Sequence, residues 1–125
     1  MNCPKCHAAM EPVDFEGITV DRCTACRGIW FDAKEHGALK EMKGAQAIDT
    51  GDEVTGRRMD AITAINCPRC QTPMITRTGV DHHHITFEVC TTCNGAYLDA
   101  GEFTALKSYT FRDYIRGLFH KPKKP

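Results

Sequence analysis

The pairs Cys3-Pro4-Lys5-Cys6 and Cys23-Thr24-Ala25-Cys26, with 16 residues between them, are the strongest indication of how this chain folds. A second set, Cys67-Pro68-Arg69-Cys70 and Cys90-Thr91-Thr92-Cys93, has 19 residues between its pairs. This spacing is typical of a four-cysteine zinc site, in which two tight turns each supply two sulfurs to one ion. We therefore expect two Zn²⁺ ions, one per set. The predicted ligands are Cys3, Cys6, Cys23 and Cys26 for the first ion, and Cys67, Cys70, Cys90 and Cys93 for the second.

The two cysteine sets belong to an internal duplication. Met10 recurs as Met74, 64 residues later, as does the first cysteine pair. Beyond the second pair the offset is 67, and it relates Gly28, Asp32, Glu35 and Leu39 to Gly95, Asp99, Glu102 and Leu106. The second copy therefore carries three extra residues, around 81–84, which predict a loop or a hairpin tip. We expect Gly28 and Gly95 to supply the positive φ with which a cysteine turn can end.

The chain divides into two copies of about 42 residues, each too small to bury a stabilising core without metal. We predict a first zinc ribbon over 1–43, a linker over 44–65 and a second zinc ribbon over 66–108. The linker is expected to hold a short helix around Val54–Ile65. The predicted fold class is a small metal-bound α+β protein with two tandem zinc ribbons. Each ribbon would consist of short antiparallel β-hairpins followed by a helix.

An acidic signature follows each second cysteine pair. Asp32 stands three residues before Glu35, and Asp99 stands three residues before Glu102. An N-cap Asp with Glu at the third helical position forms a capping box, so a helix should begin after each Asp. The alternative, a catalytic pair of carboxylates, is not needed to explain this spacing.

Together these motifs resemble those of a family of zinc fingers in small bacterial proteins, related to the zinc ribbon of transcription factor IIB. The shared pattern is Cys-Pro-x-Cys, a Met four residues on, Cys-x-x-Cys-x-Gly, an aromatic residue and Asp-x-x-Glu. Both copies fit, although Ala96 and Tyr97 stand where the first copy has Ile29 and Trp30. The resemblance implies a zinc-ribbon fold, the eight cysteines as zinc ligands and a role related to transcription.

Charge argues against nucleic-acid binding by most of the chain. The formal charge is zero, with 16 Lys and Arg against 16 Asp and Glu. Eight thiolates and two Zn²⁺ would bring the metal-bound chain to about −4. Residues 109–125 alone carry about +4, from Arg112, Arg116, Lys121, Lys123 and Lys124 against Asp113. Since duplex binding depends on neutralising phosphates, only this basic tail qualifies.

Apolar residues recur at helical spacing towards the C-terminus, among them Phe103, Leu106, Tyr114 and Leu118. We predict a longer amphipathic helix that continues into residues 109–125. It could pack on a ribbon, bind a partner or associate with a second copy. A membrane surface or a nucleic acid could be contacted through its Phe119–Lys121 end.

The histidines offer a further metal hypothesis. His82 and His84 would share one face of a strand, where they could form a weak second metal site. Solvated hairpin residues are the simpler interpretation. His7 and His36 lie near the cysteine sets as possible donors to sulfur.

Composition and motifs favour a cytoplasmic binding module over an enzyme. No apolar run is long enough to span a membrane, and reduced thiols fit a reducing compartment. Four sulfurs close each site, whereas catalytic zinc keeps an open position. We expect interaction with a protein partner through exposed aromatics near Trp30 and Tyr97, the groove between the copies or the C-terminal helix. The alternatives are nucleic-acid binding by the tail, a redox or chaperone-like thiol protein, and a rubredoxin-like iron electron carrier.

Overall fold

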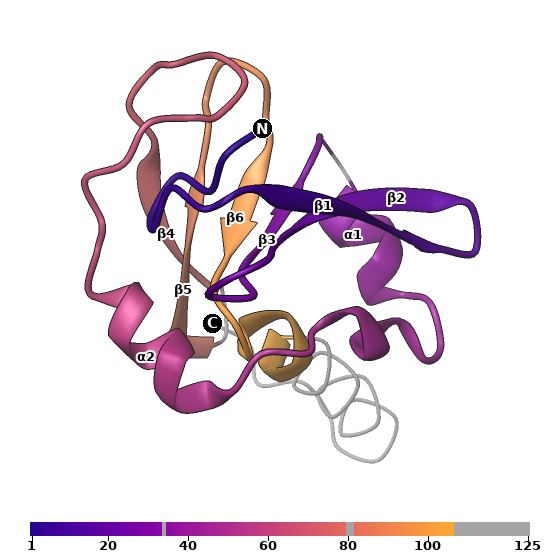
Figure 1. Cartoon of the computed structure of the whole chain (residues 1–125). Coiled ribbons are helices and arrows are strands. Elements are labelled where there is room, and N and C mark those ends of the chain that lie inside the picture. The colour runs from indigo at the N-terminus through magenta and orange to yellow at the C-terminus, as the bar shows by residue number, and fades with distance from the viewer. Residues whose placement is uncertain (34, 80–81, 107–125) are drawn as a thin grey trace, which may run out of the picture.

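Six antiparallel strands form one sheet in the computed structural model, which describes residues 1–33, 35–79 and 82–106 (Figure 1). The strands are β1 (Met10–Phe15), β2 (Ile18–Cys23), β3 (Ile29–Phe31), β4 (Ile75–Gly79), β5 (His82–Val89) and β6 (Ala96–Leu98). Their order, β1-β2-β3-β6-β5-β4, places the first repeat in one half of the sheet and the second repeat in the other. The two repeats are therefore halves of one sheet.

The repeats meet where β3 pairs with β6. Trp30 lies opposite Tyr97, with Ile29 opposite Leu98 and Phe31 opposite Ala96. Because Trp30 and Tyr97 occupy equivalent positions in the duplication, this antiparallel pairing relates the two repeats by a local twofold axis. The hydrogen bonds of β3 and β6 thus join segments that lie 67 residues apart in the sequence.

The hairpin ends differ between the repeats. Glu16 and Gly17 connect β1 to β2, and both have the positive φ typical of a two-residue hairpin turn. In the second repeat, Gly79 pairs with His82 after a register shift, so the extra residues of this copy lie at a hairpin end, as predicted. Residues 80–81 and the side chains of His82, His83 and His84 lie outside the described part of the structure. The histidine metal site remains a prediction.

A helix follows each aspartate, as the capping signature predicted. α1 covers Glu35–Lys40, and residues 102–106 are helical in the second repeat. Glu35 Oε1 accepts a hydrogen bond from Asp32 N at 2.7 Å, and Glu102 Oε1 accepts one from Asp99 N at 2.7 Å. Residues 107–125, which include the predicted longer C-terminal helix and the basic tail, lie outside the described residues. No helix among the described residues has the length and hydropathy to cross a membrane.

The segment between the repeats contains a short 3-10 helix, η1 (Ala45–Ile48), and α2 (Glu53–Asp60). Asp52 caps α2 by accepting a hydrogen bond from Thr55 N at 2.7 Å. The predicted helix is present, but it ends at Asp60. The Asp49 carboxylate accepts hydrogen bonds at 2.9 Å from Gly101 N and Thr104 N. This contact fixes the segment to the second repeat. Figure 1 shows the segment passing beside the helix that follows β6.

Gly56→Ala is expected to destabilise the protein, although alanine favours an isolated helix by about 1 kcal/mol. A Cβ on Gly56 would overlap the Ala100 carbonyl oxygen, so α2 would have to move away from the second repeat. We expect a loss of about 1–3 kcal/mol, measured by urea unfolding at fixed zinc concentration. Val54→Ala, at a 65% exposed position of the same helix, is the control and should have little effect. An unchanged stability for Gly56→Ala would contradict this packing.

The sheet has a buried cluster on each side of its centre. Ile29, Phe31, Ala96 and Leu98 contribute to one cluster. The helix at the end of each repeat adds to the same cluster, through Leu39 of α1 and through Phe103 and Leu106 of residues 102–106. Both repeats therefore contribute to this cluster. Trp30 and Tyr97 alternate with these residues along β3 and β6 and belong to the other cluster, which contains the cysteines.

The prediction that the aromatics near Trp30 and Tyr97 are exposed is wrong. Both side chains have 0% exposure. Each would be open to solvent on an isolated ribbon, but the pairing of β3 with β6 places them side by side under the two cysteine clusters. They are therefore core residues of the joined repeats and offer no partner-binding surface.

Candidate metal centres

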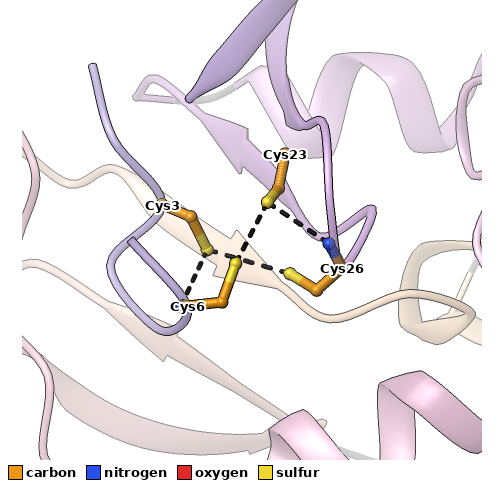
Figure 2. Close-up of side chains that lie close together, drawn as sticks. All are labelled: Cys3, Cys6, Cys23 and Cys26. Atoms are coloured by element: carbon orange, nitrogen blue, oxygen red, sulfur yellow. Dashed lines mark hydrogen bonds between the residues drawn. The ribbon is translucent and has the colours of Figure 1, made fainter. Parts of the chain in front are cut away.

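The first candidate centre is formed by two turns of the first repeat. Cys3 and Cys6 come from the turn before β1, whereas Cys23 is the last residue of β2 and Cys26 lies in the turn that leads to β3. Figure 2 shows the four side chains converging. The Sγ atoms of Cys3 and Cys26 are 3.8 Å apart, and those of Cys6 and Cys23 are 3.3 Å apart. Four sulfurs around one zinc at about 2.3 Å are about 3.8 Å from one another. All four sulfurs here lie within 4.8 Å of one another, so the cluster is suited to an ion.

The second candidate centre repeats the arrangement in the second half of the sheet. The Sγ atoms of Cys67 and Cys93 are 3.8 Å apart. Together with the sulfurs of Cys70 and Cys90, they lie within 4.8 Å of one another. All eight cysteines are free thiols in the structure. Each predicted ligand set is therefore brought together, and both four-cysteine clusters are suited to a metal ion.

The turns present backbone N–H groups to the sulfurs. Lys5 N and Cys6 N both lie 3.4 Å from Cys3 Sγ, and Cys93 N lies 3.5 Å from Cys90 Sγ. The side-chain contact with Cys26, followed by these N–H groups, lowers the pKa of Cys3 to about 4. Burial opposes ionisation of Cys90, but the N–H groups of Cys93 and Thr92 lower its pKa to about 6. Each cluster thus contains a sulfur already disposed to be the thiolate that a metal requires.

The expectation that Gly28 and Gly95 adopt positive φ is wrong. The residue directly after each second cysteine takes that conformation instead, with φ of 66° at Arg27 and 64° at Asn94. The glycines are needed for another reason. A Cβ on Gly28 would overlap the Tyr97 hydroxyl, and one on Gly95 would overlap the Trp30 indole.

Comparison with known families agrees with this geometry. The family described as transcription factor zinc-finger matches residues 2–42 and 66–109, more than half of the chain. The chain belongs to the transcription factor zinc-finger family. Each matched segment of this zinc-finger protein contains one of the two four-cysteine clusters. No curated protein and no solved structure gave a significant match.

Each aromatic residue at the centre of the sheet covers the metal centre of the other repeat. Tyr97 Oη, from the second repeat, lies 3.1 Å from Cys3 Sγ and 3.3 Å from Cys26 Sγ. Burial and the neighbouring sulfurs raise the pKa of Tyr97 well above its usual range, so its hydroxyl keeps its proton. Trp30, from the first repeat, packs against Gly95 in the second cysteine turn. Each candidate centre of this zinc-finger protein is thus covered by an aromatic residue of the other repeat.

Ion pairs also connect the two repeats, each joining a base of one repeat to acids of the other. Lys5 Nζ lies 2.7 Å from Asp99 Oδ2 and 3.0 Å from Glu88 Oε1, and all three side chains have 0% exposure. Its ammonium also donates to the Met59 carbonyl oxygen at 3.0 Å. Lys5 belongs to the first repeat, whereas both carboxylates belong to the second.

Arg69 makes the reciprocal pairs. Its guanidinium contacts Asp32 Oδ2 at 3.0 Å and Asp21 Oδ2 at 3.5 Å, in the first repeat. The sequence analysis predicted neither the ion pairs of Lys5 nor those of Arg69. The available signal was that a base follows Cys-Pro in both copies, and that Asp21 recurs as Glu88 at the same offset of 67 as the capping aspartates.

A group of carboxylates lies beside Lys5. Ligand oxygens of Asp60, Asp99 and Glu102 lie within 4.8 Å of one another, and Thr86 Oγ1 donates to Asp60 at 2.9 Å. Burial, together with the charge of Asp99 and a hydrogen bond with Asp60, raises the pKa of Glu102 to about 10. Burial also raises the pKa of Asp99 to about 7, although Lys5 opposes this shift. We therefore expect Glu102 to be protonated at neutral pH.

Glu102→Gln is expected to stabilise the protein increasingly as pH rises from about 5 to 9. Glutamate has an unfolded pKa of about 4.3, so the folded state holds an extra proton between that pH and about 10. Its contribution to stability is complete below a pH of about 4.3 and is lost as pH rises through this window. Glutamine mimics the neutral acid at every pH. The measurement is the difference in unfolding free energy between variant and wild type at fixed free zinc.

Glu35→Gln, at the equivalent position of the first repeat, provides the matched control. Burial raises the pKa of Glu35 too, but less strongly than that of Glu102, so its pH dependence should be shallower. A pH-independent difference for Glu102→Gln would mean that Glu102 is ionised in the folded protein.

Proposed function

We propose that this protein is a non-enzymatic module in which two structural Zn²⁺ ions, one per four-cysteine cluster, stabilise a surface that binds another protein. The observation that carries the proposal is that four sulfurs converge at each centre. With four protein ligands on one ion, no coordination position is left for water or substrate, as structural zinc sites require. The family's description supports a role related to transcription.

Zinc is favoured over iron by the family, while the donor set alone suits both metals. Elemental analysis of freshly isolated protein tests this choice directly. We expect two equivalents of zinc per chain and a colourless solution. Two equivalents of iron, with the red colour of an iron–sulfur chromophore, would instead support an electron carrier of the rubredoxin type. Disulfide-linked cysteines without metal would support a redox thiol protein.

The proposed protein partner is tested by comparing the intact chain with a shorter one that ends at Ser108. Both are immobilised in the zinc-loaded form and exposed to cytoplasmic extract, because the clustered thiols suit a reducing compartment. A protein retained by both chains would bind the described sheet and helices. A protein retained only by the intact chain would bind residues 109–125. That protein could be a second copy of the chain. Absence of any protein specifically retained by the intact chain would contradict the proposal.

Nucleic-acid binding through the tail is the second candidate. It is favoured by the net charge of about +4 on residues 109–125, for which five Lys and Arg residues stand against one Asp. The body of the protein is less suitable, since Lys5 is buried and Arg69 is already paired with two aspartates. Binding of RNA or DNA by the intact chain, lost in modest salt and in the shorter chain, would support this alternative.

A further inference from the structure

The two metal centres differ in one contact: a hydroxyl of the second repeat, that of Tyr97, contacts the sulfurs of the first centre. Tyr97 Oη lies within 3.3 Å of two sulfurs of the first centre, Cys3 Sγ and Cys26 Sγ. These sulfurs come from different turns and are 3.8 Å apart. A single buried O–H therefore contacts both turns at once. Because it donates to thiolate, it both offsets negative charge on sulfur and fixes the positions of the two ligands.

The second centre receives no equivalent donor from the aromatic residue that covers it. Its counterpart of Tyr97 is Trp30, which presents ring carbons to Gly95. The indole N–H of Trp30 donates to Asp32 Oδ1 at 3.0 Å and so is directed away from sulfur. The hydroxyl of Thr72 lies 3.8 Å from Cys90 Sγ, a much longer contact than those of Tyr97.

The cysteines of the second centre are also the more exposed ones. In the first centre Cys6 is half-buried and the other three cysteines are buried. In the second centre both Cys70 and Cys93 are half-buried. Thiolates that are more accessible and receive fewer donors are the more reactive ones, towards electrophiles and towards competing metal chelators.

We propose that Tyr97 is a positioning residue for the metal centre of the other repeat, and that it makes the two centres unequal. The first centre, Cys3, Cys6, Cys23 and Cys26, holds its ion permanently. The second centre, Cys67, Cys70, Cys90 and Cys93, is the exchangeable site, where an incoming ligand can displace a sulfur so that one zinc ion replaces another, and where thiol reagents act first. This inference rests on the metal binding in the proposed function.

The test is competitive alkylation of the zinc-loaded full-length chain with N-ethylmaleimide, followed by peptide mapping that assigns each modified cysteine to its centre. In the wild type we expect the second centre to be labelled about tenfold faster than the first. Tyr97→Phe keeps the ring and removes only the hydroxyl. It should raise the labelling rate of the first centre by about 10-fold, within the range found for partners of metal ligands, and leave the second centre unchanged.

Exchange of the bound zinc against an excess of an added zinc isotope gives a second readout, in which both centres stay occupied. In the wild type one equivalent should exchange quickly and one slowly, whereas in Tyr97→Phe both should exchange quickly. Thr72→Val is the matched control, because it removes a hydroxyl 3.8 Å from a sulfur of the second centre. We expect this variant to change either rate by less than about twofold, since its contact is close to the limit for a hydrogen bond.

Several results would overturn the inference. Equal labelling of the two centres in the wild type would do so without any variant, as would faster labelling of the first centre. An unchanged first-centre rate in Tyr97→Phe would show that burial alone sets the order. Equal acceleration at both centres would indicate general loosening of the fold. Zinc content measured beforehand separates these results from failure of the proposed function, in which two equivalents of zinc would not be present.

Discussion

Cys23→Ser is expected to unfold both repeats, although it removes a ligand from only the first. Cys23 is fully buried and its Sγ lies 3.3 Å from that of Cys6. Three sulfurs and a weak hydroxyl cannot hold zinc with comparable affinity. A structural zinc site contributes on the order of 10–16 kcal/mol, as much as the whole stability of a small domain, about 5–15 kcal/mol. The second repeat should unfold as well, because it depends on two parts of the first repeat. β3 pairs with β6, and Trp30 covers the second centre.

Two-dimensional NMR of the zinc-saturated variant is the measurement. Amide signals from residues 3–43 and from 66–106 should both collapse to the narrow range of an unfolded chain. Ala25→Ser is the matched control, since it adds a hydroxyl to an exposed position of the same turn without changing a sulfur. Its spectrum should stay native. A spectrum of Cys23→Ser in which residues 66–106 remain native would show that the second repeat folds alone, contrary to the shared core.

Lys5→Met is expected to cost about 3–5 kcal/mol of unfolding free energy at saturating zinc, because it leaves two buried carboxylates without their cation. Lys5 Nζ contacts both Glu88 and Asp99, and none of the three side chains is exposed. Methionine preserves most of the length and volume of the lysine stem, so the loss measures mainly the missing charge. Urea unfolding followed by circular dichroism gives the difference from the wild type.

Arg69→Met supplies a control within the same molecule. Arg69 plays the reciprocal role at the equivalent position of the second repeat, but its side chain is 46% exposed. Exposed ion pairs contribute about 0–1 kcal/mol, so this variant should be close to the wild type. If Lys5→Met and Arg69→Met lost equal unfolding free energy, burial would not distinguish the ion pairs of Lys5 from those of Arg69. A negligible loss for Lys5→Met would mean that Glu88 and Asp99 are neutral in the folded protein.

Local patterns in the sequence predicted those features that depend on a few neighbouring residues. The Cys-x-x-Cys pairs predicted two clusters of four sulfurs, and the structure contains both. Asp32 and Asp99 were predicted to begin helices in capping boxes with Glu35 and Glu102, and each glutamate does accept a hydrogen bond from the backbone of its aspartate. The aspartate side chains bond elsewhere, to Arg69 and Lys5. In these cases turn geometry or the first helical turn sets the contact, so spacing along the chain is sufficient.

The same reasoning failed where a contact partner lies in the other repeat. Trp30 and Tyr97 were expected on the surface, because a single ribbon has nothing to cover them, yet both are fully buried. Gly28 and Gly95 were assigned to turns, whereas they make room for these two rings. The aspartates of the capping signature were not expected to pair with Lys5 and Arg69.

Ligand and capping residues act over three or four positions, so the metal-binding clusters and the starts of helices could be predicted from local sequence patterns. The joining of the two repeats into one sheet could not be predicted in this way. That pairing depends on the complementary edges of β3 and β6 and on apolar faces too small to be buried within either repeat. Each repeat covers the other's candidate metal centre and pairs with the other's acids, so the difference between the two centres arises from contacts between the repeats.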